Sequence, residues 1–141
     1  MQGPRESLVY QLEKLGRTLW IRSVRQFTEL GIYPGQDQVL LLLWERDGRG
    51  QGELIEVLGV EPPTVSKMLR RMIAAGLVRR ERAPQGGRAW SVFLTERGRS
   101  LRDPVLRIWA EKQRQLQAAL TADEAVQLHG LVQRLAAQVE G

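Results

Sequence analysis

Residues 62–75 form the segment of this sequence that is best suited to contact another molecule. Its apolar residues fall on one side of a helical wheel, and its polar and basic residues fall on the other. Serine and threonine side chains can reach base edges or phosphates in the major groove of B-DNA, and lysine or arginine can fork onto guanine. The same pattern also describes an ordinary amphipathic helix with a solvated basic face. The residues that we expect to contact DNA are Pro63, Thr64, Ser66, Lys67, Arg70 and Arg71.

A second basic feature follows directly. Alternating apolar and polar residues predict two strands, at 77–82 and 88–94, joined by a short connection at 83–87 that is rich in proline and glycine. Such a thin hairpin could enter the minor groove, where an arginine meets the enhanced negative potential of narrow A·T-rich segments. We therefore expect Arg82 and Arg88 to contact DNA as well. For Arg88, a plain surface position at the end of a strand is the alternative.

The charge of the sequence is concentrated around these two features. The chain has 21 Lys and Arg residues against 16 Asp and Glu residues, a net charge of +5. Ten of the basic residues and two of the acidic ones lie within residues 67–102, so this stretch carries +8 and the rest of the chain −3. A positive block in an otherwise slightly acidic chain is typical of a polyanion-binding surface. An arginine-rich surface that contacts only solvent is the alternative.

The residue counts exclude several kinds of site. The chain has no cysteine, which rules out disulfides, thiolate metal sites, a cysteine nucleophile and thiol-based redox sensing. Its only histidine, His129, cannot form a multi-histidine metal site and is more typical of a surface or interface position than of a pH switch. Asp123 and Glu124 fit the start of a helix better than a catalytic pair. We therefore expect no enzyme activity, no metal and no cofactor.

The elements that must position these residues follow from hydrophobic periodicity. At 141 residues the chain is expected to form one domain, or one domain with attached helices. The glycine-rich segment 48–52 is interpreted as a connecting turn, and Gly76 as a helix stop. Helices are predicted at 8–30, 34–47, 53–58 and 62–75, then after Thr95 with an interruption near Pro104, and finally from Thr121.

Three of these helices carry more specific predictions. The first has a narrow apolar stripe, which indicates packing against a partner helix. Pro104 removes an internal hydrogen bond, so its helix is expected to kink there, or to restart with Asp103 as the cap. Thr121 and Glu124 have the spacing of a capping box at the start of the last helix.

The sequence shows no sign of a membrane or secretory segment. Its start is polar, and its longest apolar run, residues 39–44, is too short to span a bilayer. We therefore expect a cytoplasmic protein without membrane contact.

Two adjacent short helices followed by a hairpin form a winged helix-turn-helix, here between long terminal helices. At this level the sequence resembles the MarR family of transcriptional regulators from about residue 32 to 98, and more weakly through both termini. The helix-turn-helix stretch at 54–66 is shared by many winged-helix families. Its combination with the stretch at 76–80 and with Leu-Thr-x-x-Gly at 94–98 is more specific. The leucine-rich first helix and the start of the last helix also match.

The resemblance implies a mainly α fold with a small β-hairpin wing, in which the winged helix-turn-helix is flanked by N- and C-terminal dimerisation helices. It implies a homodimer whose first helix and last two helices interlock. Residues 33–99 would then bind DNA, and residues 1–32 and 100–141 would form the helical dimerisation region of one intertwined domain. Among the residues expected to contact DNA, those that match groove-facing or wing positions of the family are Pro63, Thr64, Ser66, Lys67, Arg70 and Arg88.

The sequence departs from the family at two places. Gly86 and Gly87 occupy the positions of the usual wing aspartate and first wing arginine, and Glu61 replaces the usual serine-like helix cap.

The resemblance also implies a small aromatic or phenolic effector, for which Trp20 with Arg17, and Trp109, are the candidate pocket residues. At these spacings aromatic residues are more often part of the core. The absence of cysteine excludes the oxidation-sensing mode that part of the family uses.

Together these patterns predict a dimeric transcriptional regulator, in this family most often a repressor. Its partner would be double-stranded DNA, with an inverted-repeat operator whose half-sites lie about one helical turn apart. Two alternatives stay open. The basic face could dock an acidic protein as an interaction module, or the chain could bind DNA of any sequence without a regulatory ligand.

Overall fold

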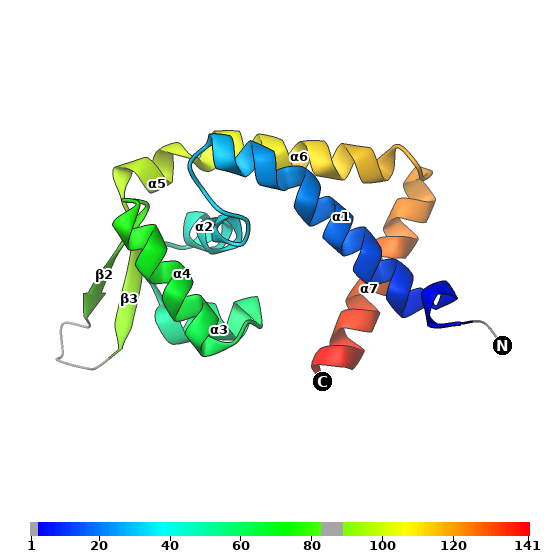
Figure 1. The fold of residues 1–141 in the computed structure, drawn as a ribbon, viewed down its shortest axis with the longest axis horizontal. Helices are drawn as coiled ribbons and strands as arrows, with labels where there is room; N and C mark the ends of the chain where they lie inside the picture. The colour runs from blue at the N-terminus through cyan, green and yellow to red at the C-terminus, as the bar shows by residue number, and fades with distance from the viewer. Residues whose placement is uncertain (1–2, 83–88) are drawn as a thin grey trace. The chain divides into compact units, whose positions relative to one another are not determined.

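The computed structural model describes residues 3–82 and 89–141, and the chain divides into two compact units, Met1–Leu106 and Arg107–Gly141 (Figure 1). Helices predominate, and the strands form one small antiparallel sheet, so the predicted fold class is confirmed. In the described ranges, no helix has the length and apolar character needed to cross a membrane. In chain order the elements are η1 Pro4–Glu6, α1 Leu8–Glu29, α2 Gln36–Glu45, β1 Arg49–Gly50, α3 Gln51–Leu58, α4 Pro62–Ala74, β2 Val78–Arg82, β3 Trp90–Leu94, α5 Glu96–Ser100, α6 Arg102–Gln117 and α7 Ala122–Glu140.

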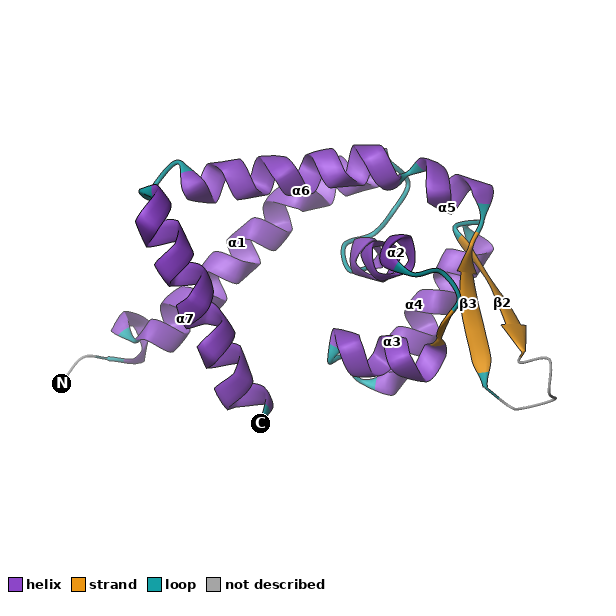
Figure 2. Cartoon of the chain, turned by 180° about the vertical axis from the view of Figure 1, so that it is seen from behind, coloured by secondary structure: helices purple, strands orange, loops and turns teal. Residues whose placement is uncertain are grey.

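The sheet has three strands, in the order β1-β3-β2, where the sequence predicted a two-stranded hairpin (Figure 2). The interpretation of residues 48–52 as a plain turn is therefore wrong, because Arg49 and Gly50 pair with Val92 and Ser91 of β3. Residues from Gln51 onward already belong to α3. So short a strand has no periodicity of its own, and it exists only because β3 supplies hydrogen-bond partners from far along the chain.

The core of the first unit lies between the sheet and helices α2, α3 and α4. Helix α2 is central, as predicted, since three of its apolar residues, Val39, Leu40 and Leu43, are buried. The side chains that are fully removed from solvent include Val39, Leu40, Leu43, Leu54, Val65, Leu69, Met72, Leu77 and Val92. This packing ties α4 to the rest of the unit along one face and leaves its opposite face uncovered.

The predicted helix ends are confirmed at two positions and corrected at one. Gly76 follows α4 with a φ of +74°, the left-handed conformation expected of a helix stop. Thr95 caps α5 by accepting a hydrogen bond from the Gly98 N–H at 3.1 Å. Asp103 is not a cap, because α6 already begins at Arg102. Pro104 lies in the first turn of α6, where its missing N–H has no helical partner to lose.

In the second unit, the start of α7 is the predicted capping box. The Thr121 hydroxyl accepts from the Glu124 N–H at 3.1 Å, and the Glu124 carboxylate accepts from the Thr121 N–H at 2.9 Å. Hydrogen bonding of the Glu124 carboxylate, first to the Thr121 backbone and then to the Thr121 side chain, lowers the pKa of this carboxyl. The acidic pair 123–124 is thus part of a helix start, as expected.

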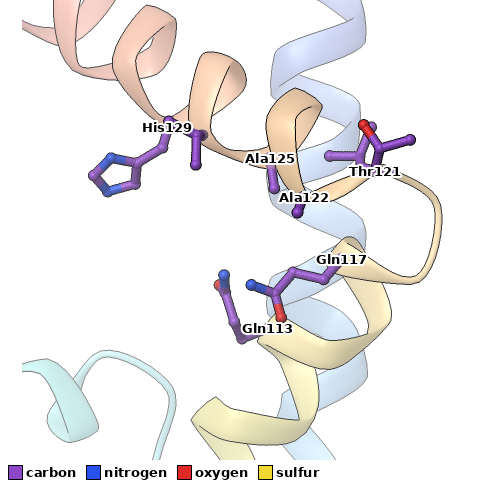
Figure 3. Close-up of a pocket in the computed structure, with 8 residues that line it drawn as sticks. Gln113, Gln117, Thr121, Ala122, Ala125 and His129 are labelled. Atoms are coloured by element: carbon purple, nitrogen blue, oxygen red, sulfur yellow. The ribbon is translucent and has the colours of Figure 1, made fainter.

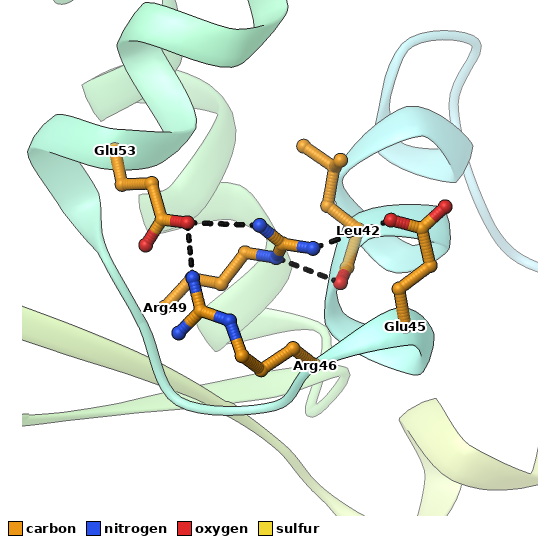
Figure 4. Close-up of polar contacts among 5 residues, drawn as sticks. All are labelled: Leu42, Glu45, Arg46, Arg49 and Glu53. Atoms are coloured by element: carbon orange, nitrogen blue, oxygen red, sulfur yellow. Dashed lines mark hydrogen bonds and ion pairs between the residues drawn. The ribbon is translucent and has the colours of Figure 1, made fainter.

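Arg49 joins the end of α2 to the start of α3 (Figure 4). Its Nε donates to the Leu42 carbonyl oxygen at 2.9 Å, and its two terminal nitrogens reach Glu53 at 2.8 Å and Glu45 at 3.2 Å. Its side chain is only 12% exposed, whereas that of Arg46, which pairs with the same Glu53 carboxylate, is 59% exposed. The network fixes the segment that carries β1 and thereby the free edge of the sheet.

Arg49→Ala is therefore expected to lower the free energy of unfolding by about 2 kcal/mol, because it removes charge-assisted hydrogen bonds from a nearly buried group. Arg46→Ala removes the same charge and a contact to the same carboxylate at an exposed position, and should cost no more than about 0.5 kcal/mol. Urea unfolding of both variants measures the difference. Equal losses in the two variants would show that burial of Arg49 contributes nothing.

Candidate nucleic-acid interface

Helix α4 presents a basic face because three of its large apolar residues are buried on the opposite side. Val65, Leu69 and Met72 have no exposed surface. Pro62 opens the helix in its first turn, where Glu61 precedes it without a side-chain cap. Of the residues predicted to contact DNA, those of α4 that are exposed are Pro63, Thr64, Lys67, Arg70 and Arg71. Five of the six predicted contacts of this helix therefore lie on its exposed side.

Ser66 is the predicted contact that differs, since it is partly buried at the border with α3. Its hydroxyl accepts a hydrogen bond of 3.2 Å from the Nε2 atom of Gln51, and Gln51 is the first residue of α3. This bond holds α4 against the first helix of the helix-turn-helix pair. Gly59, with a φ of +63°, makes the tight turn between the two helices. Sequence reasoning did not single out Gln51, because nothing in its local pattern signals a contact fifteen residues away.

The basic side chains of α4 carry uncompensated charge. Within residues 3–82 and 89–141, neither Lys67, Arg70 nor Arg71 forms an ion pair with a carboxylate. A row of such charges beside a helix attracts anions strongly, because no internal partner competes for the cations. The row borders a hollow of about 440 Å³, whose other wall is formed by Tyr33 and Pro34 ahead of α2.

The hairpin lies beside α4 in the same unit (Figure 1). Arg82, predicted to contact DNA, is exposed at the end of β2, opposite Trp90 of β3. Arg88, the other predicted contact of the wing, lies outside the described residues, as do Gly86 and Gly87. The structure thus brings Arg82 and the basic row of α4 into one compact unit.

The candidate effector residues lie in different units. In the first unit, Arg17 and Trp20 are exposed on α1, with Trp20 at 44%. In the second unit, the Lys112 ammonium lies 4.4 Å from the ring centroid of Trp109. Neither tryptophan lines one of the three pockets that the structure describes. A role of these residues in ligand binding therefore stays a prediction.

A pocket of about 630 Å³ lies within the second unit, between α6 and α7 (Figure 3). Gln113 and Gln117 border it from α6, and His129 borders it from α7. Its other lining residues are mostly small or apolar. Among the described residues there is no group of three or more acidic or histidine side chains that could hold a metal ion.

Comparison with known proteins finds similarity in the part of the chain that contains α4. Residues 32–89 match the model of the MarR family. The chain is similar to the HTH-type transcriptional regulator TtmR of Methylorubrum extorquens (strain PA1), with 41% identity over 70 residues, which are 50% of this chain and 35% of that protein. It spans between 35% and 54% of the length of the curated relatives it matches.

Two solved structures extend the likeness to nearly the whole chain. The transcriptional repressor CouR, bound to a 23-mer DNA duplex, is 26% identical and superposes with a TM-score of 0.84 over 96% of this chain and 98% of that one. The PcaV regulator from Streptomyces coelicolor, in complex with its natural ligand, is 23% identical, with a TM-score of 0.85 over 96% of both chains. At 23% identity, the likeness to PcaV is one of fold.

Proposed function

The chain belongs to the MarR family through its winged helix-turn-helix, and on this premise we propose that it is a DNA-binding transcriptional regulator, a repressor rather than an enzyme. The observation that carries the proposal is the basic row on the exposed face of α4, which has no ion-pair partner among the residues that the structure describes. Lys67 and Arg70 would lie in the major groove, where a guanidinium can fork onto guanine. The wing would follow the adjacent phosphates. CouR, a repressor of the same fold, was solved on DNA.

We further propose that two copies bind one operator. Supporting this, α1 exposes Leu8, Leu12 and Leu15, by 64%, 41% and 47%, along one helical stripe. Helix α7 exposes a comparable row, with Leu131 at 50% and Leu135 at 42%. Apolar surface of this extent is unfavourable in water and is covered in a dimer. We assign residues 1–32 and 100–141 to dimerisation and residues 33–99 to DNA binding, with an inverted-repeat operator.

Selection from a random-sequence duplex library, followed by a salt titration, tests the proposal. We expect an inverted repeat with half-sites about one helical turn apart, because a two-fold dimer presents two copies of α4. The logarithm of affinity should fall steeply with that of salt, by about 0.9 per phosphate contacted. A single half-site as consensus would contradict the dimer. Equal affinity for all duplexes would favour a sequence-tolerant protein, and absence of binding would favour an acidic protein partner.

A small aromatic or phenolic anion is the effector that we propose. The support is the exposed indole of Trp20 with the Arg17 guanidinium one turn earlier on α1, a pair suited to a ring and a carboxylate. PcaV, which shares the fold, was solved with its natural ligand. Aromatic carboxylates added to the bound duplex should release it, and a series that leaves binding unchanged would contradict this part of the proposal.

A further inference from the structure

The two faces of the hairpin differ in charge. Along β2, alternate residues point to opposite faces, so Val78, Arg80 and Arg82 share one face. Cross-strand pairing places Arg82 opposite Trp90, and Val78 opposite Leu94. Because Val78 and Leu94 are buried, this is the face that packs on the core. Arg80, Arg82 and Trp90 therefore lie on the same face as Val78 and Leu94, but nearer the end of β2 at Arg82, outside the apolar core.

Both of these arginines form a cation–ring contact with the indole of Trp90. The guanidinium carbon of Arg80 lies 4.8 Å from its ring centroid, and that of Arg82 lies 4.5 Å from it. Within the ranges that the structure describes, neither guanidinium pairs with a carboxylate. Two cations share one ring, and no anion balances them. Stacking on an aromatic face leaves the N–H edge of a guanidinium available for a planar acceptor.

The opposite face of the same hairpin is balanced. Arg79 lies over the ring of Phe93, with 4.7 Å to its centroid, and it also forms an ion pair with Glu81. The two faces thus have the same type of cation–ring contact, but only one has a counter-charge. The unbalanced face is the one suited to an external anion.

We propose that Trp90 is a positioning residue for DNA binding: its indole holds the Arg80 and Arg82 side chains so that both bind the phosphate backbone next to the half-site read by α4. The inference rests on the proposed DNA-binding function and extends it to two residues, Arg80 and Trp90, that the hairpin pattern alone did not single out. DNA phosphates then meet two forked donors whose rotamers are already ordered by the ring.

The test compares variants of the full chain on the duplex selected from the library. Trp90→Leu should weaken binding roughly tenfold, which lies between the values for exposed and for desolvated cation–ring contacts. Arg80→Ala combined with Arg82→Ala should lower the salt slope by about 2, one phosphate for each arginine. In that double-alanine background, Trp90→Leu should have no further effect, because the residues that it positions are gone. Trp90→Tyr, which keeps an aromatic face, should restore most of the affinity.

Phe93→Leu is the matched control, since it removes the ring under the already paired Arg79 of the other face. It should leave affinity and salt slope as in the unmodified chain. Circular dichroism and thermal unfolding identify any variant that fails to fold. If Trp90→Leu does not fold, the affinity of Trp90→Tyr decides whether an aromatic ring at this position supports DNA binding. If Trp90→Leu weakens binding equally with and without Arg80 and Arg82, Trp90 does not position them and the inference is overturned. If the unmodified chain binds no duplex, the proposed function itself fails.

Discussion

Replacing both Lys67 and Arg70 by alanine is expected to weaken binding to the selected duplex by about 10²-fold, because a good bidentate contact to a base edge contributes roughly 1–3 kcal/mol. The loss should be largest for the selected sequence and smaller for random duplexes, since base contacts carry the sequence preference. Both side chains are exposed and lack ion pairs in the described chain, so the fold should be unaffected. Fluorescence anisotropy with the two kinds of duplex measures both quantities.

The matched control is Lys14→Ala combined with Arg25→Ala. These residues are exposed on α1, and their removal changes the net charge by the same amount and the same residue types. Only the long-range part of the attraction should change, by about threefold at low salt. If the control lost as much affinity as the α4 variant, net charge alone would account for binding, and the assignment of α4 as the recognition helix would be wrong.

Gly98→Ala is expected to lower the free energy of unfolding by about 3 kcal/mol, the cost of forcing a methyl group into a closed contact. A Cβ atom at this position would lie 2.2 Å from the Leu77 carbonyl oxygen. That oxygen cannot retreat easily, because it accepts hydrogen bonds from the Thr95 N–H at 3.1 Å and the Thr95 hydroxyl at 3.0 Å. The Gly98 carbonyl in turn accepts from the Trp44 indole N–H at 3.0 Å. The junction joins the hairpin, α5 and α2.

Thermal unfolding should show the loss as a fall in Tm of roughly 10 °C. The control is Gly16→Ala on α1, where a Cβ would have no neighbour within 4 Å. There the better helix propensity of alanine should stabilise the chain by about 0.5–1 kcal/mol. If Gly98→Ala lowers the free energy of unfolding and Gly16→Ala raises it, the steric effect of the close contact at Gly98 is distinguished from the effect of helix propensity. A Gly98→Ala variant as stable as the unmodified chain would show that the α5 junction can relax.

The recognition helix and its basic face could be predicted from the sequence because both follow from local spacing. Val65, Leu69 and Met72 recur with the helical period, and the core buries all three. The helix stop at Gly76 and the capping box at Thr121 are equally local, since each depends on residues within one turn. Local rules suffice wherever the hydrogen-bond partners of a residue lie next to it in the chain.

The errors arose where the partner of a residue is distant in the chain. Strand β1 exists through Val92 and Ser91, and the Asp47 carboxylate adds a 2.9 Å bond from the Leu94 N–H. A separate error is local: a kink at Pro104 or a restart with Asp103 as the cap was expected, but α6 begins at Arg102 and includes Asp103 in its first turn. The Leu-Thr-x-x-Gly motif was recognised by resemblance alone. The tertiary structure explains why the motif has glycine at position 98: the Leu77 carbonyl oxygen leaves no room for a Cβ atom there.

The sequence by itself determined the main helices, the caps at Thr95 and Thr121, the apolar face of α4 and the excess of positive charge around it, because these properties depend on residue type and on spacing of a few positions. Only the tertiary structure decided which of those charges are free. Pairing of β2 with β3 places Arg80 and Arg82 on one indole, and Arg79 beside Glu81 on the other face. Charge is a property of a residue, whereas its compensation depends on which residues the fold brings within a few ångströms.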